Sequence, residues 1–128
     1  EPMNVPDNLK YTKDHEWLKL DGEFAFIGIT DYAQHELGDI VFIEVETVGE
    51  TLDKEAVFGT IEAVKTVSDM FMPIGGEVLE FNEELSNKPE IINQDPYDQG
   101  WIIRLKVSDS TELDELLSPA QYKELIQE

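Results

Sequence analysis

Residues 57–72 read VFGTIEAVKTVSDMFM, a stretch in which two β-branched runs meet at one lysine. Residues 57–64 and 66–72 are rich in the β-branched and aromatic side chains that favour strands. They predict two strands that meet at Lys65. The side chain of a lysine at such a junction is expected to face solvent, because charged lysines are rarely buried.

Lys65 is also unusual in its charge environment. It is the only basic residue between Lys54 and Lys88, and residues 55–87 contain seven acids. One interpretation is a solvated lysine that offsets local repulsion and contributes little to stability. The other is an amine presented for covalent modification, and the residues around it do not decide between the two.

The rest of the chain predicts further short elements. Strands are expected at residues 15–20, 24–29, 40–46, 77–81 and 101–107. Asp21-Gly22-Glu23 predicts a hairpin between the first two strands, because Gly22 tolerates positive φ. Thr30 can cap a short helix over residues 31–37, which Gly38 would end. Residues 82–100, rich in Asn, Pro, Asp and Gly, predict a long ordered loop.

The two ends of the chain complete the expected organisation. The leucine spacing of residues 111–117 predicts a helix. Ser118-Pro119-Ala120-Gln121 is a capping box that opens a last helix over residues 119–127. Residues 1–8 are expected to be an extended segment. We therefore expect one domain over residues 1–128, mainly β, a small barrel or sandwich covered by short helices.

Composition excludes several classes of function. The chain has 29 acidic and 9 basic residues, a net charge of −20, and no cysteine. Such a charge repels nucleic-acid backbones and anionic lipid surfaces, and it favours partners with basic faces. The absence of cysteine removes disulfides and thiol chemistry. No apolar run could span a bilayer, and no signal peptide is visible, so a cytoplasmic protein is expected.

Catalytic patterns are missing from the sequence. His15 is expected inside a strand and His35 on the short helix, and neither has a second ligand at metal-binding spacing. A structural or surface role is the simpler interpretation of both. Three classes of function remain open: a carrier with a modified lysine, an acidic interaction module, or an enzyme with an unrecognised carboxylate site.

Six blocks of the sequence, taken in order, resemble the glycine cleavage system H proteins. The resemblance covers about residues 9–127. The blocks are Tyr11-Thr12-Lys13-Asp14-His15-Glu16-Trp17, Gly28-Ile29-Thr30-Asp31-Tyr32-Ala33-Gln34, Leu37-Gly38-Asp39-Ile40-Val41-Phe42, Glu62-Ala63-Val64-Lys65-Thr66-Val67-Ser68-Asp69, Pro73-Ile74-Gly75-Gly76-Glu77-Val78 and Pro96-Tyr97-Asp98-Gln99-Gly100-Trp101.

This resemblance implies a fold and a modified residue. It implies a barrel-sandwich hybrid, the flattened barrel of two antiparallel sheets found in lipoyl domains, with short covering helices. Lys65 would lie at the tip of a hairpin and carry lipoic acid in amide linkage. Val64-Lys65-Thr66 lacks the Gly or Asn of a favoured tight turn, so turn chemistry alone does not predict the hairpin tip there.

The resemblance also implies a role without catalysis and a set of partners. A pyridoxal-phosphate glycine decarboxylase would load an aminomethyl group onto the lipoyl arm. A tetrahydrofolate-dependent aminomethyltransferase would remove it, and an FAD-containing dihydrolipoyl dehydrogenase would reoxidise the arm. A lipoate ligase or a lipoyl/octanoyl transferase would modify Lys65.

Three acidic residues have roles implied by the resemblance. Glu62 and Asp69 flank Lys65 and would help recognition by the modifying enzyme, although both could be ordinary exposed acids. Glu16 would lie near the parked arm, where a carboxylate can pair with a cationic amine. Many H proteins have histidine before Leu-Gly, where this chain has Glu36. His35 is one position earlier and points about 100° away on a helix.

Two alternative carriers share the same lysine. In the first, Lys65 relays octanoyl or lipoyl groups to other carrier proteins. The second is a biotin carrier, which fits less well because that family usually surrounds its lysine with methionines, and here the neighbours are Val64 and Thr66.

Overall fold

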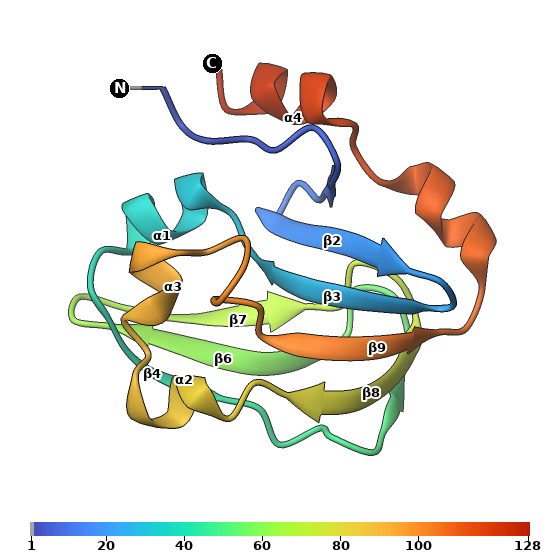
Figure 1. Cartoon of the computed structure of the whole chain (residues 1–128), viewed down its shortest axis with the longest axis horizontal. Helices are drawn as coiled ribbons and strands as arrows, with labels where there is room; N and C mark the ends of the chain where they lie inside the picture. The colour runs from blue at the N-terminus through green and yellow to red at the C-terminus, as the bar shows by residue number, and fades with distance from the viewer. Residues whose placement is uncertain (1) are drawn as a thin grey trace.

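The computed structural model describes residues 2–128 and contains two antiparallel β-sheets with short covering helices (Figure 1). The six-stranded sheet has the order β1-β2-β3-β9-β8-β5, with bounds β1 Lys10–Tyr11, β2 Glu16–Asp21, β3 Phe24–Ile29, β9 Ile103–Val107, β8 Gly76–Phe81 and β5 Thr51–Leu52. The three-stranded sheet has the order β4-β6-β7, with bounds β4 Ile40–Glu44, β6 Val57–Ala63 and β7 Val67–Phe71. The predicted fold class is confirmed, as an open rather than a closed arrangement of two sheets.

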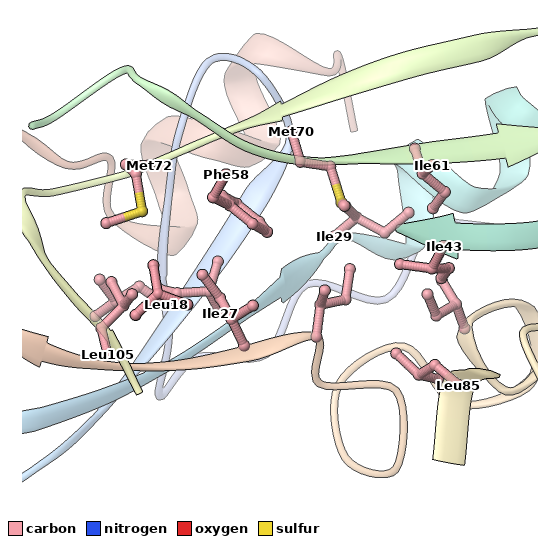
Figure 2. Close-up of a cluster of buried hydrophobic side chains, with 14 of the residues drawn as sticks. Leu18, Ile27, Ile29, Ile43, Phe58, Ile61, Met70, Met72, Leu85 and Leu105 are labelled. Carbon is pink, nitrogen blue, oxygen red and sulfur yellow. The ribbon is translucent and has the colours of Figure 1, made fainter. Parts of the chain in front are cut away.

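The main hydrophobic core lies between the two sheets. Figure 2 shows Leu18 and Ile27 of the large sheet facing Phe58 and Met70 of the small one. Each of these four side chains is at most 2% exposed. Burial of a side chain of this size stabilises a fold by about 1.5–3 kcal/mol. Because β6 and β7 contribute inward-facing residues to this core, the hairpin that they form is held firmly at its base.

A second apolar cluster covers the opposite face of the large sheet. Successive residues of a strand point to opposite faces, so Leu18 enters the main core while Trp17 enters this second cluster. Val5 and Leu9 from the N-terminal segment and Tyr122 from the C-terminal helix pack around Trp17. The two ends of the chain therefore lie side by side over the sheet (Figure 1).

Several local predictions are confirmed. β2 and β3 pair as a hairpin from Glu16↔Ile29 to Asp21↔Phe24, with Gly22 at φ 64°. Helix α1 spans Asp31–Leu37, and Thr30 Oγ1 caps it by accepting the Ala33 N–H at 3.1 Å. Helix α4 spans Pro119–Leu125 and begins with the capping box of Ser118 and Gln121.

Other predictions need correction. The expected loop 82–100 contains two one-turn helices, α2 Glu84–Asn87 and α3 Ile91–Gln94, because Leu85 and Ile92 are completely buried under them. The expected helix 111–117 is a 3-10 helix, η1 Ser110–Glu115, whose first turn is capped by Asp109. The two-residue strands β1 and β5 were not expected, since pairs this short leave no periodic pattern.

Element boundaries also differ from the expectations. The strand expected over 40–46 ends at Glu44, the one expected over 101–107 begins at Ile103, and the last helix ends at Leu125. His15 was expected inside a strand, but it lies in the bend before β2 with φ 68°. Within residues 2–128, no helix is both long and apolar enough to cross a membrane.

Candidate functional site

Lys65 lies in a tight connection between β6 and β7. Glu62 pairs with Val67, and Ala63 N donates to Thr66 O at 2.8 Å, so Val64 and Lys65 are the two residues of the turn. Neither residue has positive φ, which explains how the turn forms without Gly or Asn. The hairpin tip that resemblance implied is therefore present in the structure.

The tip of this hairpin is fastened to the segment between α1 and β4. Val64 N donates to Asp39 O at 3.1 Å. Asn93 of α3 holds that segment on both sides, because its Nδ2 donates to Gly38 O at 2.9 Å and its Oδ1 accepts from Ile40 N at 3.0 Å. Sequence reasoning missed Asn93, since residues 82–100 were expected to be a loop.

The Lys65 side chain is exposed and free of ion pairs. In the described residues 2–128, the ion pairs within 4.0 Å involve only Lys54 and Lys106. Lys65 Cε lies 3.9 Å from the position that a Cβ on Gly38 would occupy, so the side chain passes over Gly38. Its neighbours Val64 and Val67 are 72% and 63% exposed. The amine is accessible to another protein.

An open cavity of about 320 Å³ lies between α1 and β7, beside Gly38. Its apolar lining includes Ile29, Ile61 and Met70. Leu37 also lines the cavity and directly precedes Gly38, the residue over which the Lys65 side chain passes. Four carboxylates line the same cavity: Asp14, Glu16, Glu36 and Asp69. The cavity therefore combines an apolar wall with a concentration of negative charge, which suits a chain that ends in a cationic group.

Glu16 is the most deeply placed of these carboxylates, at 2% exposed. Its two oxygens accept hydrogen bonds from Thr12 Oγ1 at 2.7 Å and from Phe71 N at 3.1 Å. Burial raises the pKa of Glu16 to about 7, although both hydrogen bonds favour the ionised form. A cation in the cavity would favour ionisation further.

His15 forms part of the cavity wall just before β2. Its Nδ1 lies 2.8 Å from the Tyr122 hydroxyl, and its ring lies 4.9 Å from the Tyr32 ring. Burial lowers the pKa of His15, while Asp14 and Glu36 oppose that effect. The residue that sequence reasoning treated as structural therefore also lines the cavity.

The structure brings together some of the predicted site residues and separates others. Glu16 and Asp69 both line the cavity, whereas Glu62 does not. Glu62 is exposed on β6, opposite Val67, close to the lysine turn. Glu36 lines the cavity while the exposed His35 does not, as expected for neighbouring residues on a helix.

Thr30 was expected only as the cap of a short helix, and Tyr122 was not singled out within the expected last helix. In the structure, both are completely buried and meet through their hydroxyls at 2.7 Å. Tyr122 also reaches His15 at the cavity wall. No local pattern reveals this contact, because the two residues that it joins are 107 positions apart.

Comparisons with known proteins match the sequence to one family. A family model described as Glycine cleavage H-protein matches residues 9–128. The chain is 53% identical over 124 residues to the glycine cleavage system H protein of Bacteroides thetaiotaomicron, with 97% of this chain and 98% of the relative covered. It is 55% identical over 128 residues to that of Chlorobaculum parvum, with 98% and 100% covered.

The fold agrees in the same way. The crystal structure of a glycine cleavage system H protein from Mycobacterium marinum matches with a TM-score of 0.85 at 32% identity, covering 97% of this chain and 100% of that chain. The chain belongs to the glycine cleavage H-protein family, and it is a carrier component rather than an enzyme.

Proposed function

We propose that this protein is the lipoyl carrier of a glycine cleavage system, with lipoic acid amide-linked to Lys65. The observation that carries the proposal is the exposed, unpaired Lys65 amine at the tip of a fastened hairpin. A rigid turn presents the amine to a modifying enzyme at low entropic cost. Neutralisation of the amine by amide formation breaks no ion pair within residues 2–128.

The lipoyl group would supply a dithiolane that accepts an aminomethyl group at sulfur and later releases it. We propose that the cavity beside Gly38 receives the loaded end of the arm. Its four carboxylates attract an ammonium group, and its apolar wall receives the hydrocarbon chain. This arrangement keeps the loaded arm out of solvent between partners.

The proposed partners are a pyridoxal-phosphate glycine decarboxylase, an aminomethyltransferase that uses tetrahydrofolate, and a flavin dihydrolipoyl dehydrogenase. Tethering raises the effective concentration of the arm at each docked active site. We propose that Glu62 and Asp69, exposed on the two strands next to Lys65, help the modifying enzyme to recognise the hairpin. The net charge of −20 favours basic docking faces on all of these partners.

The test of the site is intact-mass measurement after co-expression with a lipoate ligase. The unsubstituted protein is expected to gain the mass of one lipoyl group, and Lys65→Arg is expected to gain none. Lys88→Arg is the matched control, since Lys88 is also exposed and outside the ion pairs of the described chain. A lipoyl mass on Lys65→Arg would show that the site is elsewhere.

The role in glycine cleavage needs a second assay, because an octanoyl or lipoyl relay carrier would use the same lysine. Exchange of carbon dioxide into glycine by the decarboxylase is expected to require the lipoylated protein. Exchange that proceeds equally well without it would refute the proposed role and leave the relay as the function of Lys65.

A further inference from the structure

A chain of hydrogen bonds connects the C-terminal helix to the cavity wall. Ala33 N donates to Thr30 Oγ1 at 3.1 Å, Thr30 Oγ1 lies 2.7 Å from the Tyr122 hydroxyl, and that hydroxyl lies 2.8 Å from His15 Nδ1. Thr30 and Tyr122 are completely buried. The hydroxyl hydrogens of Thr30 and Tyr122 must therefore find acceptors within this series of hydrogen bonds, because a buried donor without an acceptor is costly.

Counting the hydrogens selects one direction for these bonds. If Thr30 donates to Tyr122 and Tyr122 donates to His15 Nδ1, both hydroxyl hydrogens are used. If His15 Nδ1–H donates instead, Tyr122 must donate to Thr30, and the Thr30 hydrogen has no acceptor among the hydrogen bonds of the described residues. The first direction leaves Nδ1 as an acceptor, so a neutral His15 carries its proton on Nε2.

The surroundings of His15 show why its protonation state matters. Asp14 precedes it, Glu36 of α1 faces it, and Glu16 and Asp69 share the cavity with it. Asp14 and Glu36 favour a protonated, cationic imidazole. Burial acts in the opposite sense and lowers the pKa of His15. Burial also raises the pKa of Tyr122 to about 12, so its hydroxyl keeps the proton that it donates.

We propose that Tyr122 is a positioning residue that keeps His15 uncharged, with its proton on Nε2, so that the cavity holds no positive charge beside a loaded arm. The tautomer is a property of the unmodified protein, while the consequence for the arm rests on the proposed function. An imidazolium in this wall would repel the ammonium end of the arm. The C-terminal helix would thus act on a cavity to which it contributes no lining residue.

The first experiment reads the tautomer directly in the unmodified protein, by long-range proton–nitrogen correlation spectra of the His15 ring across a pH series. We expect Nε2 to carry the proton, with Nδ1 as acceptor. In Tyr122→Phe, we expect the pKa of His15 to rise and the tautomer preference to weaken.

Tyr11→Phe is the matched control for this measurement. The Tyr11 ring stacks on Tyr122 with ring centroids 4.7 Å apart, but its hydroxyl donates to Pro6 O at 2.6 Å, whereas the Tyr122 hydroxyl is the one that bonds His15 Nδ1. This variant shows how the removal of a tyrosine hydroxyl from the second apolar cluster affects the protein when that hydroxyl does not bond His15. We expect the His15 spectrum to be unchanged in this variant.

The second experiment measures the docked fraction of the aminomethyl-loaded arm in the lipoylated protein, from the methyl resonances of Ala33 and Met70 in the cavity. Tyr122→Phe is expected to weaken docking about two- to tenfold, the change in an equilibrium constant that corresponds to the loss of one hydrogen bond, here the one between Tyr122 and His15. His15→Asn tolerates the positive φ and cannot become cationic. In this variant, addition of Tyr122→Phe should cause no further loss.

The outcomes separate the steps of the proposal. A wild-type His15 with its proton on Nδ1, or a His15 spectrum that Tyr122→Phe leaves unchanged, would overturn the positioning role whatever the fate of Lys65. A changed tautomer with unchanged docking would overturn the functional consequence. If Tyr122→Phe also weakened docking in the His15→Asn background, Tyr122 would act on the fold and not through His15.

Discussion

Replacement of Glu16 by glutamine is expected to remove a pH-dependent cost of folding. The pKa of Glu16 rises from 4.5 to about 7 on folding, chiefly through burial. The folded protein therefore binds this proton more tightly than the unfolded chain does. The stability contributed by the neutral carboxyl is fully present below pH 4.5 and is lost as the pH rises through about 7.

The magnitude follows from the size of the shift. Each pKa unit corresponds to about 1.4 kcal/mol, so the ionised carboxylate opposes folding by about 3 kcal/mol at high pH. Between about pH 5 and about pH 8, the stability of the wild-type protein is expected to fall by about 2–3 kcal/mol relative to Glu16→Gln. Glutamine keeps both contacts, because Oε1 can accept from Phe71 N and Nε2 can donate to Thr12 Oγ1.

The assay is urea denaturation of both proteins at matched pH values, followed by the fluorescence of Trp17 and Trp101. The difference between the two free energies of unfolding isolates Glu16 from the repulsion among the other acids. Glu44→Gln serves as the control for the loss of one carboxyl group, since this acid is exposed on β4. A pH-independent difference for Glu16→Gln would refute the raised pKa that burial gives the Glu16 carboxyl.

Three further substitutions test the packing that supports the site. Gly28→Ala would place a Cβ 2.6 Å from the Trp17 ring, and the resulting overpacking should destabilise the protein by about 1–3 kcal/mol in thermal denaturation, with a changed near-UV signal. Gly38→Ala forces a side chain into φ 81°, ψ −157°, at a similar cost of about 1–3 kcal/mol, and hydrogen exchange at Val64 should become faster. Ser118→Ala removes the cap of α4 and should lower the free energy of unfolding in urea by about 1 kcal/mol, whereas Ser118→Asp should retain it.

The β-rich fold, the first hairpin and the capped helices could be predicted because their causes are local. β-branched runs, Asp21-Gly22 and the Ser118 capping box act over a few residues, and each gave an element where it was expected. Elements without a local cause were missed. Helices α2 and α3 are one turn long, and they form because Leu85 and Ile92 are buried by distant parts of the chain.

The candidate site divides in the same way. Lys65 stands out in the sequence because its isolation among acids is visible there, and the family blocks around it imply its role. The chemistry of the cavity depends on tertiary structure. Burial, which no spacing reveals, raises the pKa of Glu16, and a tyrosine 107 positions away reaches His15. Sequence patterns identify which ionisable side chains the protein carries. Only the tertiary packing decides how far each side chain is removed from water and which groups it contacts, and these two factors set its pKa and therefore its charge.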